Sequence, residues 1–246
     1  MELLTVEGLS KNFGGLSVLK NISFTINTGE RVGIIGPNGS GKTTLINIMS
    51  GVLPSSGGQI YVRGKTATKA TPYKFCRLGI SRSFQLNTLF LNIPLLDNVL
   101  IACKGKQLSW LKMIGPVNER HYLKKAQELL EMVGLWEKRK VLPKALSYGE
   151  QRLVEVVLAL ASEPSLLLLD EPSAGLSTAE VNQILNLLSN LSKDITLFFC
   201  AHDMSLLFAL ASRVVVLHYG QLIAEGTPEE IKANLKVREI YLRGSE

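Results

Sequence analysis

The spacing of apolar and polar residues predicts strands near the start of the chain and a helix after them. Residues 22–27 alternate between apolar and polar side chains, which is typical of a strand with one buried face. The apolar run at 30–35 predicts a short buried strand that leads directly into a glycine. From about Gly41 apolar residues recur at helical spacing, and Gly51 is expected to end that helix.

The middle of the chain carries a different pattern. Strand-like runs are missing over about 86–149, and helical spacing predicts helices at 92–102, at 119–133 and after Ser147. A loop is expected at 104–116. These helices form an insertion between two regions that contain strands.

After the insertion, strands and helices alternate along the chain. This alternation is typical of a mostly parallel sheet covered by helices on both faces. The sequence therefore predicts an α/β fold in which both ends of the chain contribute to one core. The predicted elements are strands at 165–169, 195–200 and 213–217 and helices at 178–191 and 203–211.

Composition limits the class of protein. The 246 residues fit one large domain or two small ones, and 46% apolar and 20% charged residues exclude a disordered or collagen-like chain. The apolar fraction is somewhat high for a soluble monomer, which suggests a surface that binds a partner. No apolar run approaches the roughly 20 residues of a membrane span, no leader pattern opens the chain, and the three cysteines have no paired spacing. We therefore expect a cytoplasmic protein.

Basic residues exceed acidic ones by 27 to 21, which gives a net charge of +6. The lysines and arginines cluster at 104–112, 138–144 and 232–243. Solvated helix faces explain such clusters, and a polyphosphate ligand or the anionic inner face of a membrane is the alternative. Aromatic residues are not interleaved with these charges, so no nucleic acid is expected as a partner.

The strongest chemical pattern lies between the strand at 30–35 and the helix after it. Residues 36–43 match G-x-x-x-x-G-K-[ST], the phosphate-binding loop whose backbone N–H groups and helix N-terminus face phosphates. Lys42 would neutralise the β- and γ-phosphates of a nucleotide, and the Thr43 hydroxyl would bind Mg²⁺. The alternative is a glycine turn that only caps a helix. The residues expected at the nucleotide are Gly36, Pro37, Asn38, Gly39, Ser40, Gly41, Lys42, Thr43 and Thr44.

Two carboxylates follow the apolar run at 166–169. Asp170 and Glu171 are expected at the carboxyl end of a buried parallel strand, beside the phosphate-binding loop, where open α/β sheets bind ligands. Asp170 suits a Mg²⁺ site, and Glu171 suits a base that polarises the attacking water. Taken alone, such a pair more often begins a helix or a loop, but the phosphate-binding loop favours the catalytic interpretation.

The hexapeptide LSYGEQ at 146–151 resembles the LSGGQ signature of the ATP-binding subunits of ABC transporters, with tyrosine in place of the first glycine. Four further elements fit this family in order along the chain. Phe13 stands at the adenine-stacking aromatic, Gln85 at the Q-loop, residues 173–177 at the D-loop and His202 at the switch histidine. The resemblance covers nearly the whole chain.

The resemblance implies a single ABC ATPase domain over residues 1–246. Its expected fold is a P-loop NTPase (RecA-like) core with a mostly parallel sheet, an N-terminal antiparallel β portion and an inserted α-helical subdomain. Residues 1–85 and 153–246 would form the nucleotide-binding core, and residues 86–152 the helical subdomain that carries the signature. ATP and Mg²⁺ are the implied cofactors.

The resemblance also implies that one chain holds half of each active site. Two ATP molecules would hold two subunits together, as a homodimer or as a heterodimer with a second ABC ATPase subunit, and hydrolysis would release them. Transmembrane permease subunits would dock near 85–102, a substrate-binding protein would act indirectly, and the chain would lie on the inner face of the cell membrane. The implied catalytic residues are Glu171, His202 and Gln85, the implied Mg²⁺ ligands are Thr43, Gln85 and Asp170, and the residues implied to contact the γ-phosphate of the opposite subunit are Ser147, Gly149 and Gln151.

Each element has a structural alternative. Ser147, Ser177 and Thr227 each precede a glutamate by three residues, which is the pattern of a capping box. Phe13 could belong to the core, and His202 could be structural. Ser177 also departs from the family, where aspartate is most frequent at this D-loop position, so communication between the two sites could be weaker.

Softer features indicate a subgroup. The segments 12–16, 82–85, 104–118 and 240–242 resemble ATPase subunits for branched-chain or hydrophobic amino-acid uptake and for urea uptake in bacteria. Lipopolysaccharide-export ATPases share the short tail but lack the loop. An ATPase of another ABC system and a soluble ABC protein without a transport role are the alternatives. The Asn-Lys-x-Asp motif by which a GTPase recognises guanine is absent from the sequence.

Overall fold

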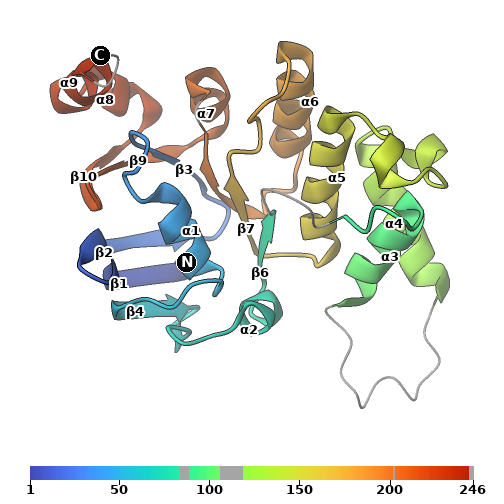
Figure 1. The fold of residues 1–246 in the computed structure, drawn as a ribbon, viewed down its shortest axis with the longest axis horizontal. Coiled ribbons are helices and arrows are strands. Elements are labelled where there is room, and N and C mark those ends of the chain that lie inside the picture. Colours follow the sequence, from blue (N-terminus) through green and yellow to red (C-terminus); the bar gives the residue numbers. More distant parts are fainter. Residues whose placement is uncertain (84–88, 106–118, 202, 244–246) are drawn as a thin grey trace.

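The computed structural model describes residues 1–83, 89–105, 119–201 and 203–243, and its strands form two sheets (Figure 1). The smaller sheet is antiparallel and has the strand order β2 (Leu16–Asn27), β1 (Glu2–Phe13), β4 (Gly57–Val62) and β5 (Lys65–Thr66). The larger sheet has the order β10 (Gln221–Gly226), β9 (Arg213–His218), β3 (Arg31–Ile35), β8 (Thr196–Cys200), β7 (Leu166–Asp170) and β6 (Ile80–Ser83).

The larger sheet is parallel from β9 to β6, and β10 at its edge runs antiparallel to β9. Neighbouring parallel strands such as β3 and β8 are far apart in the sequence, because parallel strands need a crossover that usually contains a helix. The predicted α/β fold, with an antiparallel N-terminal portion and a mostly parallel sheet, is confirmed.

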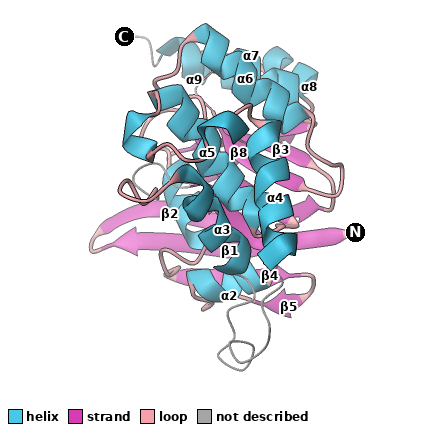
Figure 2. Cartoon of the chain, turned by 90° about the vertical axis from the view of Figure 1, so that its right-hand side faces the viewer, coloured by secondary structure: helices cyan, strands magenta, loops and turns pink. Residues whose placement is uncertain are grey.

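The helices form two groups. Figure 1 shows the helices of the insertion at one end of the molecule and the last two helices at the opposite end, and Figure 2 views the molecule from the insertion end. The insertion contains α3 (Leu95–Gly105), α4 (Glu119–Met132), the 3-10 turns η2 (Trp136–Lys138) and η3 (Pro143–Ala145), and α5 (Tyr148–Ala161). The other helices are α1 (Lys42–Met49), α2 (Pro72–Arg77), α6 (Thr178–Ser189), α7 (Met204–Leu210), α8 (Pro228–Ala233) and α9 (Leu235–Arg243).

Most predicted helices are found with shifted ends. The helix expected at 92–102 begins at Leu95, directly after a proline, since the residue before a proline avoids the helical conformation. The loop expected at 104–116 lies mostly outside the described residues. The short elements β5, β6 and α2 were not predicted from the sequence, because their few residues give too little periodicity.

The core consists of two hydrophobic clusters on the two faces of the larger sheet. In β7, Leu167 and Leu169 belong to the cluster shared with α5, α6 and α7, whereas Leu166 and Leu168 belong to the cluster shared with α1 and the smaller sheet. Successive strand side chains point to opposite faces, so an apolar run of four residues serves both clusters. The sheet is therefore covered on both faces, as predicted.

The three predicted capping boxes are all formed. At α5 the Glu150 N–H donates to Ser147 Oγ at 3.2 Å, and the Ser147 N–H donates back to Glu150 Oε2 at 3.0 Å. Ser177 with Glu180 caps α6 in the same way, and Thr227 caps α8. Such caps satisfy N–H groups that a helix leaves unpaired and typically contribute about 1 kcal/mol.

The helical insertion is continuous with the rest of the core. Helix α5 crosses residue 152, the predicted end of the helical subdomain, and its apolar residues lie in the same cluster as those of α3, α4 and the larger sheet. The division into a nucleotide-binding core and a helical subdomain stays a prediction. Among the described residues, no helix combines the length and apolar character that crossing a bilayer requires.

Candidate functional site

The phosphate-binding loop joins β3 to α1 at the carboxyl edge of the larger sheet. Ile34, Cys200 and Asp170 are paired in register across β3, β8 and β7. The loop after β3 and the carboxylates after β7 therefore leave the sheet at the same edge, which is where the sequence placed them.

Two glycines allow the loop to take its tight path. A Cβ on Gly36 would lie 2.1 Å from the Leu217 carbonyl oxygen, and Gly41 has a φ of 108° that side chains rarely adopt. Gly41 is also the N-cap of α1, where no described side chain forms a capping hydrogen bond and the first turn holds no acidic residue. The first N–H groups of α1 are consequently available to an anion, with the positive end of the helix dipole behind them.

A cation and a hydroxyl lie over the loop. Lys42 is 6% exposed, and its ammonium donates hydrogen bonds to the Gly36 carbonyl at 2.7 Å and the Pro37 carbonyl at 3.0 Å. Ser40 Oγ is buried without a hydrogen-bond partner among the described residues. Buried polar groups are almost always paired, so the loop fits a bound phosphate that pairs with the Ser40 hydroxyl. Asn38 and Gly39 are exposed at its tip, and Thr44 is half-buried on α1.

Asp170 is held between a hydroxyl and a guanidinium. It is 2% exposed, Thr43 Oγ1 donates to its Oδ1 at 3.4 Å, and Arg82 Nη2 donates to its Oδ2 at 3.1 Å. Burial raises the pKa of Asp170, although the Arg82 charge opposes this rise. Arg82 also donates to the side-chain oxygen of Asn47 on α1, so it fixes the carboxylate relative to the helix that carries Thr43.

Arg82 is a site residue that no sequence pattern predicted. It lies on β6 opposite Leu168 of β7, and this pairing follows from strand register rather than from any local pattern. One signal was present in the sequence, since Arg82 stands three residues before the Q-loop residue.

Glu171 continues the carboxylate pair in a strained turn. Its φ is +53°, a conformation that is uncommon outside glycine, and its backbone N–H donates to the Cys200 carbonyl at 2.9 Å. Three side-chain atoms that could bind a metal lie within 4.8 Å of one another, one each from Asp170, Glu171 and Cys200. Burial raises the pKa of Cys200 to about 12, so the thiol stays protonated, and Mg²⁺ prefers the two oxygen ligands.

The signature residues lie elsewhere in the chain. Ser147, Gly149 and Gln151 are at the start of α5, and Figure 1 shows α5 and α1 on opposite sides of β6 and β7. Ser147 is exposed and Gly149 is buried, while Gln151 donates to the Leu146 carbonyl at 3.1 Å. One chain therefore does not bring its own signature to its own phosphate-binding loop.

The remaining predicted site residues have different outcomes. Phe13 ends β1 and is 46% exposed, with the Lys11 ammonium 4.8 Å from its ring centroid, so the alternative that it belongs to the core is wrong. An exposed ring is available for stacking. Gln85 and His202 lie outside the described residues.

Comparison with known proteins identifies the family. Residues 19–174 match the sequence profile of the ABC transporter family. The chain belongs to this family. Residues 221–242 also match a profile described as the branched-chain amino acid ATP-binding cassette transporter.

Relatives of this ABC ATPase match it over almost its whole length. The high-affinity branched-chain amino acid transport ATP-binding protein LivG of Salmonella typhimurium is 34% identical over 98% of this chain and 97% of its own. BraF of Pseudomonas aeruginosa, which bears the same description, is 33% identical over the same shares.

Solved cassettes have the same fold. The ADP conformation of MJ1267, an ATP-binding cassette of an ABC transporter, matches with a TM-score of 0.86 at 32% identity and covers 98% of this chain and 99% of that one. A dimeric structure of the bacterial cassette MJ0796 matches with a TM-score of 0.81 at 26% identity over 92% and 99%. The ABC ATPase described here is therefore an ATP-hydrolysing enzyme coupled to transport.

Proposed function

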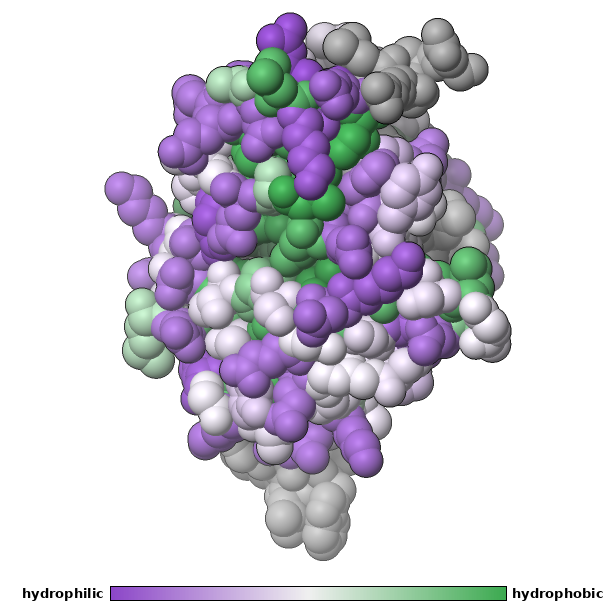
Figure 3. Space-filling view, turned by 90° about the vertical axis from the view of Figure 1, so that its left-hand side faces the viewer, coloured by the Kyte–Doolittle hydropathy of each residue, from purple (hydrophilic) through white to green (hydrophobic). Residues whose placement is uncertain are grey.

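We propose that the chain is the ATPase subunit of an importer for branched-chain or hydrophobic amino acids. The match of residues 221–242 to the branched-chain cassette profile carries the substrate class, and LivG and BraF support it. This segment forms β10, α8 and α9, far from α3 and α4 (Figure 1), on a face where an apolar strip crosses a mostly hydrophilic surface (Figure 3).

The loop after β3 binds the phosphates of ATP in this proposal. The N-terminus of α1 and the Lys42 ammonium face them, and Ser40 Oγ, which has no hydrogen-bond partner within the described part of the chain, gains one. The exposed Phe13 ring stacks on the adenine. Phosphate binding releases Lys42 from the Gly36 and Pro37 carbonyls, which hold it in place beforehand.

Thr43, Asp170 and Gln85 are the proposed Mg²⁺ ligands. The first two fit, because their oxygens already lie 3.4 Å apart at the carboxyl edge of the sheet. A bound Mg²⁺ supplies neutralising charge for the β- and γ-phosphates. Arg82 keeps Asp170 oriented toward α1, Glu171 polarises the attacking water, and His202 contacts the γ-phosphate.

The separation of α5 from α1 supports active sites shared between two chains. Ser147, Gly149 and Gln151 of each chain contact the γ-phosphate bound to the other, in a homodimer or in a heterodimer with a second ABC ATPase. The dimeric MJ0796 cassette is consistent with such a pair. No nucleic acid takes part.

Permease subunits are the proposed membrane partners. Phe90, Leu91 and Ile101 are exposed apolar side chains within the predicted docking region. In this proposal the chain lies at the inner face of the membrane through these partners, and a substrate-binding protein acts on it indirectly. Exposed apolar patches of this kind typically mark interaction sites.

The proposed chemistry is tested with Glu171→Gln, which keeps the size of the side chain but accepts no proton. We expect hydrolysis to stop while ATP affinity is kept, so that ATP holds two chains together and light scattering detects a dimer. ADP lacks the γ-phosphate and should leave monomers. Rapid hydrolysis by Glu171→Gln would contradict the assignment of the base.

The substrate is tested in proteoliposomes that contain the permease subunits encoded beside this chain. We expect ATP hydrolysis to rise when a binding protein loaded with leucine is added, and not when urea replaces leucine. If ATP hydrolysis rises with urea and not with leucine, or if the complex extracts lipid from the membrane, the amino-acid assignment is rejected and another ABC system is favoured.

A further inference from the structure

The N-terminus of the signature helix α5 lies against the N-terminus of α6 in the same chain. The D-loop at 173–177 connects β7 to α6 and ends at Ser177, the N-cap of α6. Glu180, in the first turn of α6, accepts hydrogen bonds on its Oε2 from the Ser177 N–H at 2.9 Å and the Ser177 hydroxyl at 2.7 Å. These bonds hold the Glu180 carboxylate at the end of α6.

The same carboxylate reaches the signature. Its Oε1 lies against the Gly149 backbone, in the first turn of α5. A Cβ on Gly149 would lie 2.1 Å from Glu180 Oε1 and 2.5 Å from its carboxyl carbon, so only glycine leaves room for this contact. The hydrogen bonds of the Ser177 hydroxyl and N–H, with the further one from Gly149, hold the pKa of Glu180 below its usual value, and the group is ionised at neutral pH.

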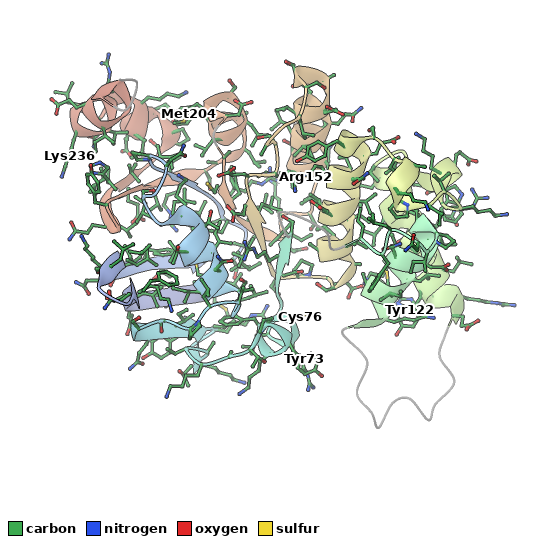
Figure 4. The ribbon with its side chains drawn as sticks, viewed as in Figure 1. Tyr73, Cys76, Tyr122, Arg152, Met204 and Lys236 are labelled. Carbon is green, nitrogen blue, oxygen red and sulfur yellow. The ribbon has the colours of Figure 1, made fainter. Side chains whose placement is uncertain are left out.

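Tyr148 connects the start of α5 to the D-loop. Its hydroxyl donates to the Ala174 carbonyl in the D-loop at 3.3 Å and accepts from Arg152 Nη2 at 2.8 Å. Arg152 lies where α5 faces α6 (Figure 4), and it pairs with Glu155 at 2.8 Å. The Tyr148 ring also lies 3.2 Å from where a Cβ on Gly175 would be. The tyrosine that departs from the family signature therefore links α5 to the D-loop within one chain.

From these contacts we infer that Glu180 is an internal competitor of ATP at the signature. In the separate chain its carboxylate lies against Gly149 at the positive end of α5. That is the place where the γ-phosphate of the opposite subunit binds in the proposed function, on which this inference rests. Two anions at one helix end repel each other. Glu180 must withdraw before the two chains close.

This competition also couples the signature to the D-loop. Glu180 is bonded to Ser177, the last residue of the D-loop, and Tyr148 is bonded to Ala174. Displacing Glu180 from Gly149 therefore changes the contacts that hold the D-loop. When the partner's ATP binds at the signature, it displaces Glu180 and so alters the D-loop. This loop begins two residues after Glu171.

The test measures ATP-dependent dimerisation in a Glu171→Gln background, by sedimentation at several protein concentrations. Glu180→Gln keeps the shape of the side chain and removes its charge. We expect the dissociation constant of the ATP-bound dimer to fall about two- to fivefold, the range expected when one charge at a helix N-terminus is removed. Added salt should narrow the difference between the two proteins.

Glu230→Gln is the matched control. Glu230 holds the same position in the capping box of α8, where it accepts from the Thr227 N–H at 2.8 Å, but α8 is far from α5 in Figure 1. We expect equal small losses of thermal stability in the two variants and tighter dimerisation in Glu180→Gln alone. Dimerisation that is unchanged or weaker in Glu180→Gln relative to Glu230→Gln would overturn the inference.

Two further results separate this inference from the proposed function. If the Glu171→Gln parent forms no ATP-dependent complex, alone or with the second cassette of its own transporter, the shared site fails and the inference fails with it. If the parent dimerises, hydrogen exchange of monomeric Glu180→Ala should be faster at the Gly149 amide than in the parent. Equal exchange at Gly149 would show that the carboxylate does not occupy this N–H in solution.

Discussion

Two helix N-termini bind phosphate in the proposed cycle, and they are built in opposite ways. Helix α1 begins at Gly41, no side chain in the described ranges caps it, its first turn holds no acidic residue, and Lys42 adds a positive charge. Helix α5 begins at Ser147 with a complete capping box that contains Glu150, and Glu180 from α6 adds a second carboxylate. The first end is open to an anion, whereas the second already holds the chain's own anions.

The two helix ends therefore have different roles in ATP binding. An open, cationic helix end binds a triphosphate in the single chain. A helix end occupied by carboxylates binds it weakly unless a partner presents the γ-phosphate in the right place. In this proposal α1 determines the affinity of the single chain for ATP, and α5 determines whether two ATP-bound chains close into a dimer.

The largest expected effect removes the cation at α1. Lys42→Ala should lower kcat/KM for ATP by about 10³-fold, because a preorganised charge on the phosphates is lost in a buried site. Steady-state kinetics measures kcat/KM, and equilibrium binding of a fluorescent ATP analogue measures the affinity for the nucleotide. The exposed Lys20→Ala serves as the control, and normal turnover by Lys42→Ala would reject the phosphate-binding loop.

Blocking the second end should separate hydrolysis from binding. Ser147→Arg places a bulky side chain where the opposite nucleotide approaches, so hydrolysis should fall by about 10²-fold or more, as for a lost transition-state contact. ATP binding to the isolated chain should be nearly unchanged, because α1 does not touch Ser147. Full hydrolysis by Ser147→Arg would mean that the signature does not approach a nucleotide.

Weakening the cap of α5 should show in the pH dependence of stability. Burial alone would raise the pKa of Glu150, but the hydrogen bonds from Lys138 and Ser147 outweigh it and lower the pKa. The ionised group therefore stabilises the folded chain by about 0.5 to 1 kcal/mol above its unfolded pKa. This contribution is lost as the pH falls through the lowered pKa.

Urea unfolding of the parent and Glu150→Gln should therefore differ at pH 7. The difference should begin to shrink near the ordinary pKa of a glutamate, about 4.3, and disappear only below the lowered pKa of Glu150. A difference that stays constant down to pH 3 would contradict the assigned role of the carboxylate.

The smallest expected effect concerns the D-loop. Ser177→Asp keeps the cap of α6, since aspartate caps as well as serine, but it loses the hydroxyl donor to Glu180 and adds a like charge beside it. The melting temperature should fall by about 1 °C, the size expected for one weak pair in a chain of this length.

A loosened Glu180 should also make ATP-dependent dimerisation slightly tighter in Ser177→Asp. Higher ATPase turnover or cooperativity in Ser177→Asp, with an unchanged melting temperature, would favour a D-loop weakened by its missing carboxylate over the capping interpretation.

Local patterns were sufficient for much of the fold and the site. The alternation in β2, the four apolar residues of β7, the phosphate-binding loop and the three capping boxes are each written in a few consecutive residues. Phe13 shows the limit of such patterns, because an aromatic residue before two glycines fits the core and the surface equally well. Its 46% exposure settled the question.

By itself, the sequence determined the fold class, the placement of Lys42, Asp170 and Glu171 at one sheet edge, and the caps, because each depends on period, spacing or neighbours within four residues. The tertiary structure alone decided that Arg82 holds Asp170 and that Glu180 occupies Gly149. The first contact depends on strand register and the second on how α5 packs beside α6. Both join residues about 30 or more positions apart, and no local pattern encodes such a distance.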